Sequence, residues 1–151
     1  MKKYVSALVV AAATLSATSA MAQFAKPEDA VKYRQSALFV MQQNVGRIAA
    51  MVQGKAPFDA KVAADSAAVA EYMGKLPWAA FVPGSDKAGN TKAKAEVWSD
   101  SAKFNAAADK MQAEMAKLNA AAKTGSLDAI KPAMGAVGGT CKGCHDDFRA
   151  Q

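Results

Sequence analysis

The residues best suited to chemistry in this 151-residue chain stand together near its C-terminus. Cys141 and Cys144 are its two cysteines, and His145 is its single histidine. In a helix these are positions i, i+3 and i+4, so the two thiols and the imidazole share one face. Two thiols at this spacing can add to the two vinyl groups at one edge of a haem, and the adjacent imidazole can reach the iron. The pattern Cys-x-x-Cys-His therefore predicts covalent attachment of one c-type haem per chain, with His145 as an iron ligand.

Three other interpretations of the two cysteines are weaker. A thioredoxin-like redox pair also uses Cys-x-x-Cys, but it requires a βαβ context that the sequence does not offer. A structural zinc site needs four ligands, and the chain has only three soft ones apart from methionine. A disulfide between residues three apart in a helix would close a very short loop and constrain the unfolded chain little. It would also leave His145 unexplained.

The first residues, MKKYVSALVVAAATLSATSAMA, have the organisation of a secretory signal peptide. Two lysines precede a short apolar stretch, and Ala20 and Ala22 form an A-x-A cleavage signal. The stretch is too short to span a bilayer stably, although an N-terminal membrane or amphipathic helix is the alternative. We therefore expect residues 1–22 to be a signal peptide cleaved after Ala22 and residues 23–151 to form one periplasmic domain.

The charge of the chain excludes one class of partner. The formal charge is +6, and it is +4 without the two lysines of the signal peptide. The lysines are scattered, and no basic cluster alternates with aromatic residues, so nucleic-acid binding is not indicated. No stretch after residue 22 is long and apolar enough to cross a membrane, so we expect no membrane insertion of the mature chain.

The elements that must position the motif are predicted to be helices. Alanine supplies much of the 52% hydrophobic fraction and aromatic residues are only 7%, a composition that favours helices. Apolar residues recur at three–four spacing in four segments, at about 27–53, 59–74, 97–123 and 126–148. A long connection lies between the second and third segments, and the other connections are short. This order predicts an all-α, antiparallel up-down-up-down four-helix bundle with one long loop between helices 2 and 3.

The sequence predicts two further details of the second and fourth helices. The apolar stripe of the second helix is expected to face the core, and its members are Val62, Ser66, Val69, Met73 and Leu76. Pro132 predicts a kink or a late start in the fourth helix. The glycines that follow it give room for a bulky group near the backbone.

The single histidine restricts the second face of the iron, which must be filled by methionine, by another group, or by nothing. Arg34 interrupts the apolar stripe of the first helix, where its guanidinium can bind a haem propionate bidentately or extend to solvent. Leu38 lies one turn later and is placed to cover the iron, although it also suits the bundle core. Met41 is the best candidate for a sixth ligand, and it equally suits a gap in the core.

The chain as a whole resembles the cytochromes c′, the high-spin class II c-type cytochromes of the proteobacterial periplasm. The resemblance covers essentially all of the mature chain. Four segments resemble family segments in family order, namely QFAKPEDAVKYRQSAL (23–38), LPWAAF (76–81), EVWSD (96–100) and CKGCHDDFR (141–149).

The resemblance implies a role for several residues. The implied roles are thioethers at Cys141 and Cys144, the proximal ligand His145, propionate contacts at Arg34 and Gln35, an apolar cover at Leu38, an aromatic near the haem at Trp78, and a basic residue near the proximal pocket at Arg149. The loop around Lys94 and Glu96 is a further candidate for contact with the propionates.

The resemblance also implies a function. The iron is expected to be five-coordinate and high-spin, to bind nitric oxide and carbon monoxide, and to serve in sequestration or transfer of nitric oxide, with electron transfer as a further role. A homodimer formed through the first two helices is expected. The alternative is a low-spin electron carrier of the same fold with Met41 as sixth ligand. A peroxidase-like enzyme would need a distal histidine, and no catalytic constellation is present, so we expect a protein that is not an enzyme.

Overall fold

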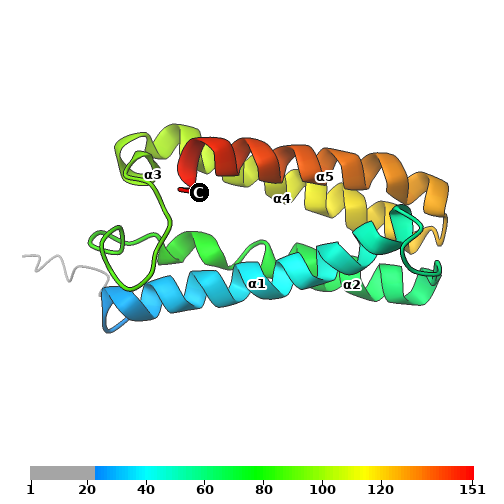
Figure 1. The fold of residues 1–151 in the computed structure, drawn as a ribbon, viewed down its shortest axis with the longest axis horizontal. Coiled ribbons are helices and arrows are strands. Elements are labelled where there is room, and N and C mark those ends of the chain that lie inside the picture. Colours follow the sequence, from blue (N-terminus) through cyan, green and yellow to red (C-terminus); the bar gives the residue numbers. More distant parts are fainter. Residues whose placement is uncertain (1–22) are drawn as a thin grey trace, which may run out of the picture.

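Four long helices lie side by side in the computed structural model, which describes residues 23–151 (Figure 1). The predicted signal peptide lies outside the described residues. The long helices are α1 (Pro27–Val52), α2 (Ala60–Met73), α4 (Ser101–Lys123) and α5 (Leu127–Phe148). The connection between α2 and α4 contains the 3-10 helix η1 (Pro77–Ala80) and the short helix α3 (Glu96–Ser99). No strand is formed between residues 23 and 151, and the one isolated β-bridge joins Ala93 to Arg149.

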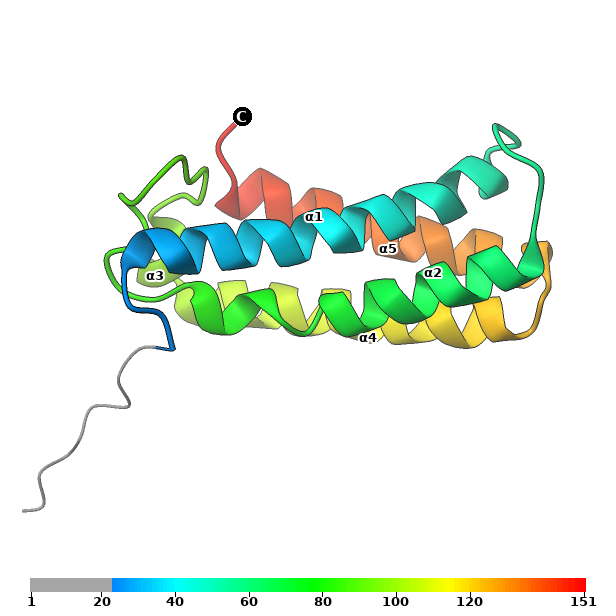
Figure 2. The ribbon, with the colours of Figure 1, turned by 90° about the horizontal axis from the view of Figure 1, so that it is seen from below.

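Consecutive helices run in opposite directions, so the predicted up-down-up-down four-helix bundle is confirmed. The pair α1–α2 lies in front of the pair α4–α5 when the molecule is seen from below (Figure 2). The long connection before α4 folds over one end of the bundle, and α5 ends at the same end (Figure 1). The Cys-x-x-Cys-His motif therefore lies on the last helix beside the long connection. Within the described part of the chain, no helix has the length and apolar composition needed to cross a membrane.

The helix ends follow the local signals of the sequence. Asp59 accepts a hydrogen bond from the Val62 N–H at the start of α2, and Ser126 accepts one from the Ala129 N–H at the start of α5. Gly125 has a positive φ of 70°, which suits the residue after the end of α4.

Two predicted details of the helices differ from the structure. Asp100 leaves the helical conformation and its side chain accepts a hydrogen bond from the Lys103 N–H, so α3 and α4 are separate where one helix was predicted. Pro132 is contained within α5, which starts at Leu127, so the late start suggested for this helix is wrong. The N-cap at Ser126 starts α5 before the proline. Pro132 has no backbone N–H, so α5 lacks one hydrogen bond at this position.

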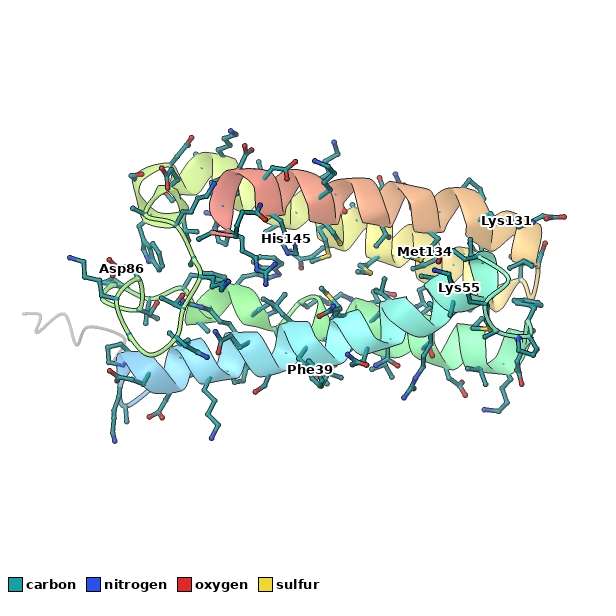
Figure 3. All side chains as sticks on the ribbon, in the orientation of Figure 1. Phe39, Lys55, Asp86, Lys131, Met134 and His145 are labelled. Atoms are coloured by element: carbon teal, nitrogen blue, oxygen red, sulfur yellow. The ribbon has the colours of Figure 1, made fainter. Side chains whose placement is uncertain are left out.

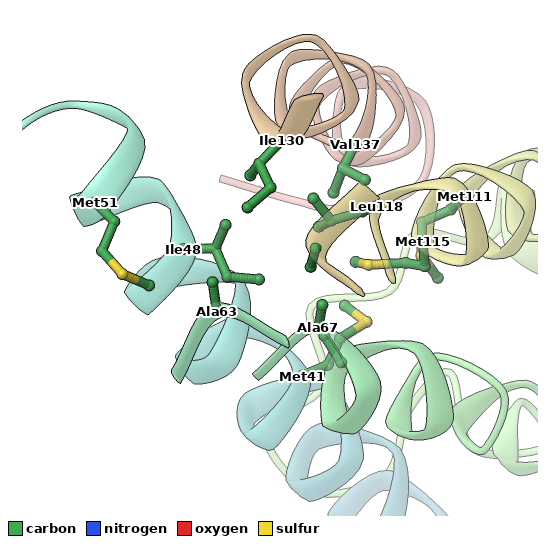
Figure 4. Packing of buried hydrophobic residues seen from close by; sticks show 12 residues of the cluster. Met41, Ile48, Met51, Ala63, Ala67, Met111, Met115, Leu118, Ile130 and Val137 are labelled. Atoms are coloured by element: carbon green, nitrogen blue, oxygen red, sulfur yellow. The ribbon is translucent and has the colours of Figure 1, made fainter. Parts of the chain in front are cut away.

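The core shows which face of α2 points inward. Ala63, Ala67 and Ala70 are buried, whereas Val62 and Val69 are 42% and 39% exposed. The predicted stripe of α2 is thus wrong for its valines. Alanine occurs on every side of this helix, so apolar periodicity does not single out one face, and the small alanine side chains allow close packing. They meet apolar residues of α1, α4 and α5 in the centre of the bundle (Figure 4), among them Ile48, Leu118, Ile130 and Val137.

Candidate haem site

Helix α5 places the three motif side chains near its C-terminal end. Cys141 and Cys144 are partly buried free thiols, and His145 is exposed. The His145 side chain points from α5 toward α1 (Figure 3). Burial raises the pKa of both thiols, and burial together with the nearby Arg149 charge lowers the pKa of His145. The lowered pKa favours the neutral imidazole, which is the form that binds a metal ion.

The geometry bears on the alternative interpretations of the cysteines. Cys141 and Cys144 do not form a disulfide. Among residues 23–151 no three or more His, Cys, Asp or Glu side chains are grouped so as to hold a metal ion. The surroundings of the motif are helical, which does not match the βαβ context of a thioredoxin-like pair.

Four glycines of α5 pack against no side chain. A Cβ atom added to Gly135, Gly138, Gly139 or Gly143 would meet nothing within 4 Å. The missing side chains therefore leave open space along the helix that carries the thiols. Cys144 also lines a groove of about 190 Å³ between α4 and α5. Two free thiols and an exposed imidazole on one helix are the features that covalent haem attachment needs.

Arg34 is buried, with 2% of its surface exposed, so extension of this side chain to solvent is excluded. Its Nη1 donates to the Ala80 carbonyl at 3.0 Å and to Ser85 Oγ at 2.7 Å. Its Nη2 donates to the Ser85 carbonyl at 2.9 Å and to Thr91 Oγ1 at 2.7 Å. The guanidinium carbon also lies 4.4 Å from the centre of the Phe81 ring.

The partners of Arg34 are all neutral, and no carboxylate of residues 23–151 forms an ion pair with it. Burial lowers the pKa of the guanidinium, although an arginine keeps its charge in proteins. A buried cation without an anion suits a site for a carboxylate. The four N–H groups on Nη1 and Nη2 already donate to oxygen atoms of the long connection. The Nε–H is therefore the donor left for a carboxylate.

The other residues predicted on α1 differ in burial. Gln35 is exposed, and its Nε2 donates to the Asn90 carbonyl at 3.5 Å. Leu38 is partly buried at the edge of the main core. Met41 is only 8% exposed, and its Sδ lies 3.5 Å from where a Cβ of Gly74 would be. The Met41 sulfur therefore packs against the end of α2, as a core methionine does.

Trp78 joins an aromatic cluster at the motif end of the bundle. Its Nε1 donates to the Gly74 carbonyl at 2.7 Å, and its ring stacks on Phe81 with centres 6.2 Å apart. Phe104 of α4 meets Phe148 of α5 edge to face in the same cluster. Trp78 and Phe81 thus contact other aromatic rings, including that of Phe104. The cluster fixes the start of α4 and the end of α5 relative to η1.

Two predicted basic residues lie beside the end of α5. Arg149 is exposed one turn after His145, and its backbone N–H donates to the His145 carbonyl at 3.1 Å. Lys94 instead uses its Nζ to donate to the Asp146 carbonyl at 2.8 Å.

The sequence did not identify Ser85 and Thr91 as partners of Arg34, because residues of an irregular loop carry no periodic signal.

An antiparallel four-helix bundle with Cys-x-x-Cys-His near the end of its last helix defines a class of helical c-type cytochromes. Residues 29–149 match the family model for cytochrome c′. The chain belongs to the cytochrome c′ family, whose members carry covalently bound haem c, and its cofactor is haem c.

Several relatives support this assignment over nearly their full length. Cytochrome c′ of Rubrivivax gelatinosus is 58% identical over 127 residues, covering 84% of this chain and 98% of the relative. The Alcaligenes xylosoxydans xylosoxydans protein is 47% identical over the same shares of the two chains. The crystal structure of the Rubrivivax protein aligns with a TM-score of 0.82 and 57% identity, covering 85% of this chain and all of that one. A nitric oxide complex of a leucine-to-alanine variant from Alcaligenes xylosoxidans aligns with a TM-score of 0.79 and 45% identity, covering 85% of this chain and 99% of that one.

Proposed function

We propose that this protein is a periplasmic gas-binding cytochrome c′ in which His145 is the only axial ligand of a five-coordinate, high-spin iron. It binds nitric oxide and carbon monoxide and serves in sequestration or transfer of nitric oxide, with electron transfer as a further role. The nitric oxide complexes of the related Alcaligenes protein support this choice of ligand. The periplasmic location rests on the signal-peptide pattern of residues 1–22.

The observation that carries the coordination state is the position of the Met41 sulfur. It is buried against Gly74 in the main core, between α1 and α2, and the chain has no second histidine. A low-spin carrier would require Met41 to leave this packing and turn its sulfur toward the iron. The five-coordinate state leaves Met41 in place.

The residues around the haem then have distinct tasks. Cys141 and Cys144 hold the group through thioethers, and His145 binds the iron from the α5 side. Leu38 covers the opposite side with an apolar surface. Such a surface offers no hydrogen bond to a charged or strongly polar ligand, which would lose its hydration without compensation. A small neutral gas loses little hydration there and binds at the open iron position.

The haem edge has polar neighbours on α1. Arg34 provides a buried positive charge with one uncommitted N–H, and Gln35 lies beside it on the exposed side. We assign both to the propionates. Trp78 borders the same end of the bundle, and Arg149 stands near the proximal side. No group in this set acts as an acid–base pair, so the protein is proposed to bind its ligand without chemical conversion.

The proposed homodimer uses the outer face of α1 and α2. Large apolar side chains are exposed there, namely Phe39 (59%), Tyr72 (64%), Val62 and Val69. A groove of about 210 Å³ on this face is lined by these two valines together with Asn44, Arg47, Asp65 and Ser66. Exposed apolar patches of this kind mark protein interfaces, and a two-fold axis would bury the same patch on both copies.

An optical spectrum of the purified haem-loaded protein tests the coordination state. We expect a ferrous spectrum with one broad band in the α/β region, as a five-coordinate high-spin iron gives. Sharp, separated α and β bands would contradict the proposal and would favour Met41 as sixth ligand. The Met41→Leu variant distinguishes the two cases, because its spectrum should match that of the unmodified protein if the sulfur stays in the core.

A further inference from the structure

Residues 91–94, here called the bridging segment, contact both walls of the proposed haem site. At one end, Thr91 Oγ1 accepts a hydrogen bond from Arg34 Nη2 of α1 at 2.7 Å. The same oxygen accepts one from the Ala93 N–H at 3.2 Å, which fixes the backbone of the segment. At the other end, the Lys92 carbonyl accepts from the Ala150 N–H at 2.8 Å, next to the bridge between Ala93 and Arg149.

Lys94 contacts the end of α5 most extensively. The last four carbonyl groups of a helix have no partner within the helix. The Lys94 backbone N–H donates to the Phe148 carbonyl at 2.9 Å, and its Nζ donates to the Asp146 carbonyl at 2.8 Å. The Nζ charge also lies at the negative end of the helix dipole, where a cation is stabilising. A residue more than fifty positions away in sequence thus caps the turn that follows His145.

We propose that the bridging segment positions the proximal ligand, with Lys94 as a positioning residue for His145 and the Arg34–Thr91 contact as its anchor on α1. The proposal rests on the assignment of His145 as the iron ligand. His145 lies in the last turn of α5, and helix ends open more readily than helix centres. Two hydrogen bonds from Lys94 hold this turn closed, so the imidazole keeps one distance and orientation toward the haem.

Other charged groups near this turn do not replace Lys94. Lys142 pairs with the Asp146 side chain and Lys103 pairs with the Asp147 side chain, and all four partners are largely exposed. Exposed ion pairs contribute little to stability, and these two use side-chain carboxylates, so neither lysine donates to a backbone carbonyl at the end of α5. The Lys94 Nζ donates to the Asp146 carbonyl. A contact between this Nζ and a haem propionate would therefore break the hydrogen bond that caps the end of α5.

The test compares Lys94→Met with Lys87→Met in the haem-loaded protein. Both variants remove one positive charge from the same long connection, but Lys87 is exposed and forms no hydrogen bond among the contacts described above. The first readout is hydrogen–deuterium exchange of the peptide covering residues 146–151, followed by mass spectrometry. We expect exchange about fivefold faster in Lys94→Met, as loss of one hydrogen bond implies, unchanged exchange in Lys87→Met, and protection restored in Lys94→Arg.

The second readout is the iron–histidine stretching band of the ferrous protein in resonance Raman spectra. It should shift or broaden in Lys94→Met and stay unchanged in Lys87→Met. Equal exchange rates in the two methionine variants would contradict the claim that the Lys94 side chain caps α5. Faster exchange with an unchanged iron–histidine band would overturn the positioning role. The exchange measurement does not depend on the sixth ligand, so a low-spin spectrum would defeat the proposed function and leave the result on the cap standing.

Discussion

Leu38 and Met41 lie three residues apart on α1 and differ in burial. Met41 packs its sulfur against Gly74, whereas Leu38 is partly buried at the edge of the core. The sequence could not decide between them as neighbours of the iron, because both fit the same apolar stripe. The direction of a flexible methionine depends on the tertiary contact with Gly74, which local periodicity does not encode.

Leu38→Ala tests the apolar cover at the residue scale. Removing the isobutyl group opens the distal face, so we expect carbon monoxide to associate with the ferrous protein at least about tenfold faster, since steric exclusion limits access there. Stopped-flow mixing measures this rate. Val45→Ala is the matched control, because Val45 is also a partly buried α1 residue packed against the same core. An unchanged rate in Leu38→Ala, or an equal increase in both variants, would show that Leu38 does not cover the iron.

Arg34 shows how far a single residue could be interpreted from its position in the sequence. A charged residue within an apolar stripe indicated a side chain in need of a partner, and Arg34 is buried with four hydrogen bonds. Its neutral partners, Ser85 and Thr91, lie in the irregular long connection and come close only when that connection folds over α1. The sequence therefore predicted that Arg34 needs a partner, but not that four of its donors hold the loop.

At the scale of helices, the alanine-rich segments were the least predictable. The positions and ends of the four long helices agree with the capping residues and glycines of the sequence, within a few residues. The inward face of α2 was mispredicted because Ala63 and Ala67 pack inside while the larger Val62 and Val69 remain outside. Hydrophobicity ranks valine above alanine, but close approach of α2 to its neighbours requires the smaller side chain.

Glu71→Gln tests the polar link between α2 and α4. Glu71 Oε2 accepts a hydrogen bond from the buried Asn119 Nδ2 at 2.5 Å, and Oε1 pairs with Lys75 at 2.8 Å. These two contacts, the Lys75 one first, lower the pKa of Glu71. A carboxylate with a lowered folded-state pKa stabilises the fold above its unfolded pKa, and that stabilisation is lost as the pH falls through the folded pKa.

We therefore expect Glu71→Gln to lower the free energy of unfolding at pH 7 by about 1–2 kcal/mol, in line with a hydrogen bond to a charged group. The difference from the unmodified protein should shrink on acidification below the ordinary glutamate pKa of 4.5. Urea unfolding at several pH values measures both effects. Glu114→Gln is the control, because among residues 23–151 Glu114 forms its one ion pair with the exposed Lys117. A difference that is constant with pH, or equal in the two variants, would contradict this account.

At the scale of the whole molecule, the lengths of the connections predicted the topology of the bundle. They did not predict which residues the longest connection contacts. Short connections force neighbouring helices to be antiparallel, so the sequence predicted the order of the bundle. The bridging segment at residues 91–94 joins α1 to the end of α5 through hydrogen bonds between residues distant in sequence. Such pairings depend on the assembled fold, and single-residue propensities carry no information about them.

The exposed valines of α2 provide the last prediction, which concerns assembly. Val69 lies beside the groove on the outer face of α1 and α2, within the apolar patch proposed as the dimer interface. A charge placed there would be desolvated by the partner copy without compensation, so Val69→Glu should weaken dimerisation at least about tenfold. Sedimentation velocity of the haem-loaded protein over a range of concentrations measures the dimer dissociation constant.

Ala113→Glu is the matched control for this measurement, because Ala113 is exposed on α4, away from the proposed interface. It adds the same charge to the same protein and should leave the dimer intact. Two outcomes would contradict this interface. One is an unmodified protein that sediments as a monomer at all concentrations, and the other is equal weakening of the dimer by both glutamate variants.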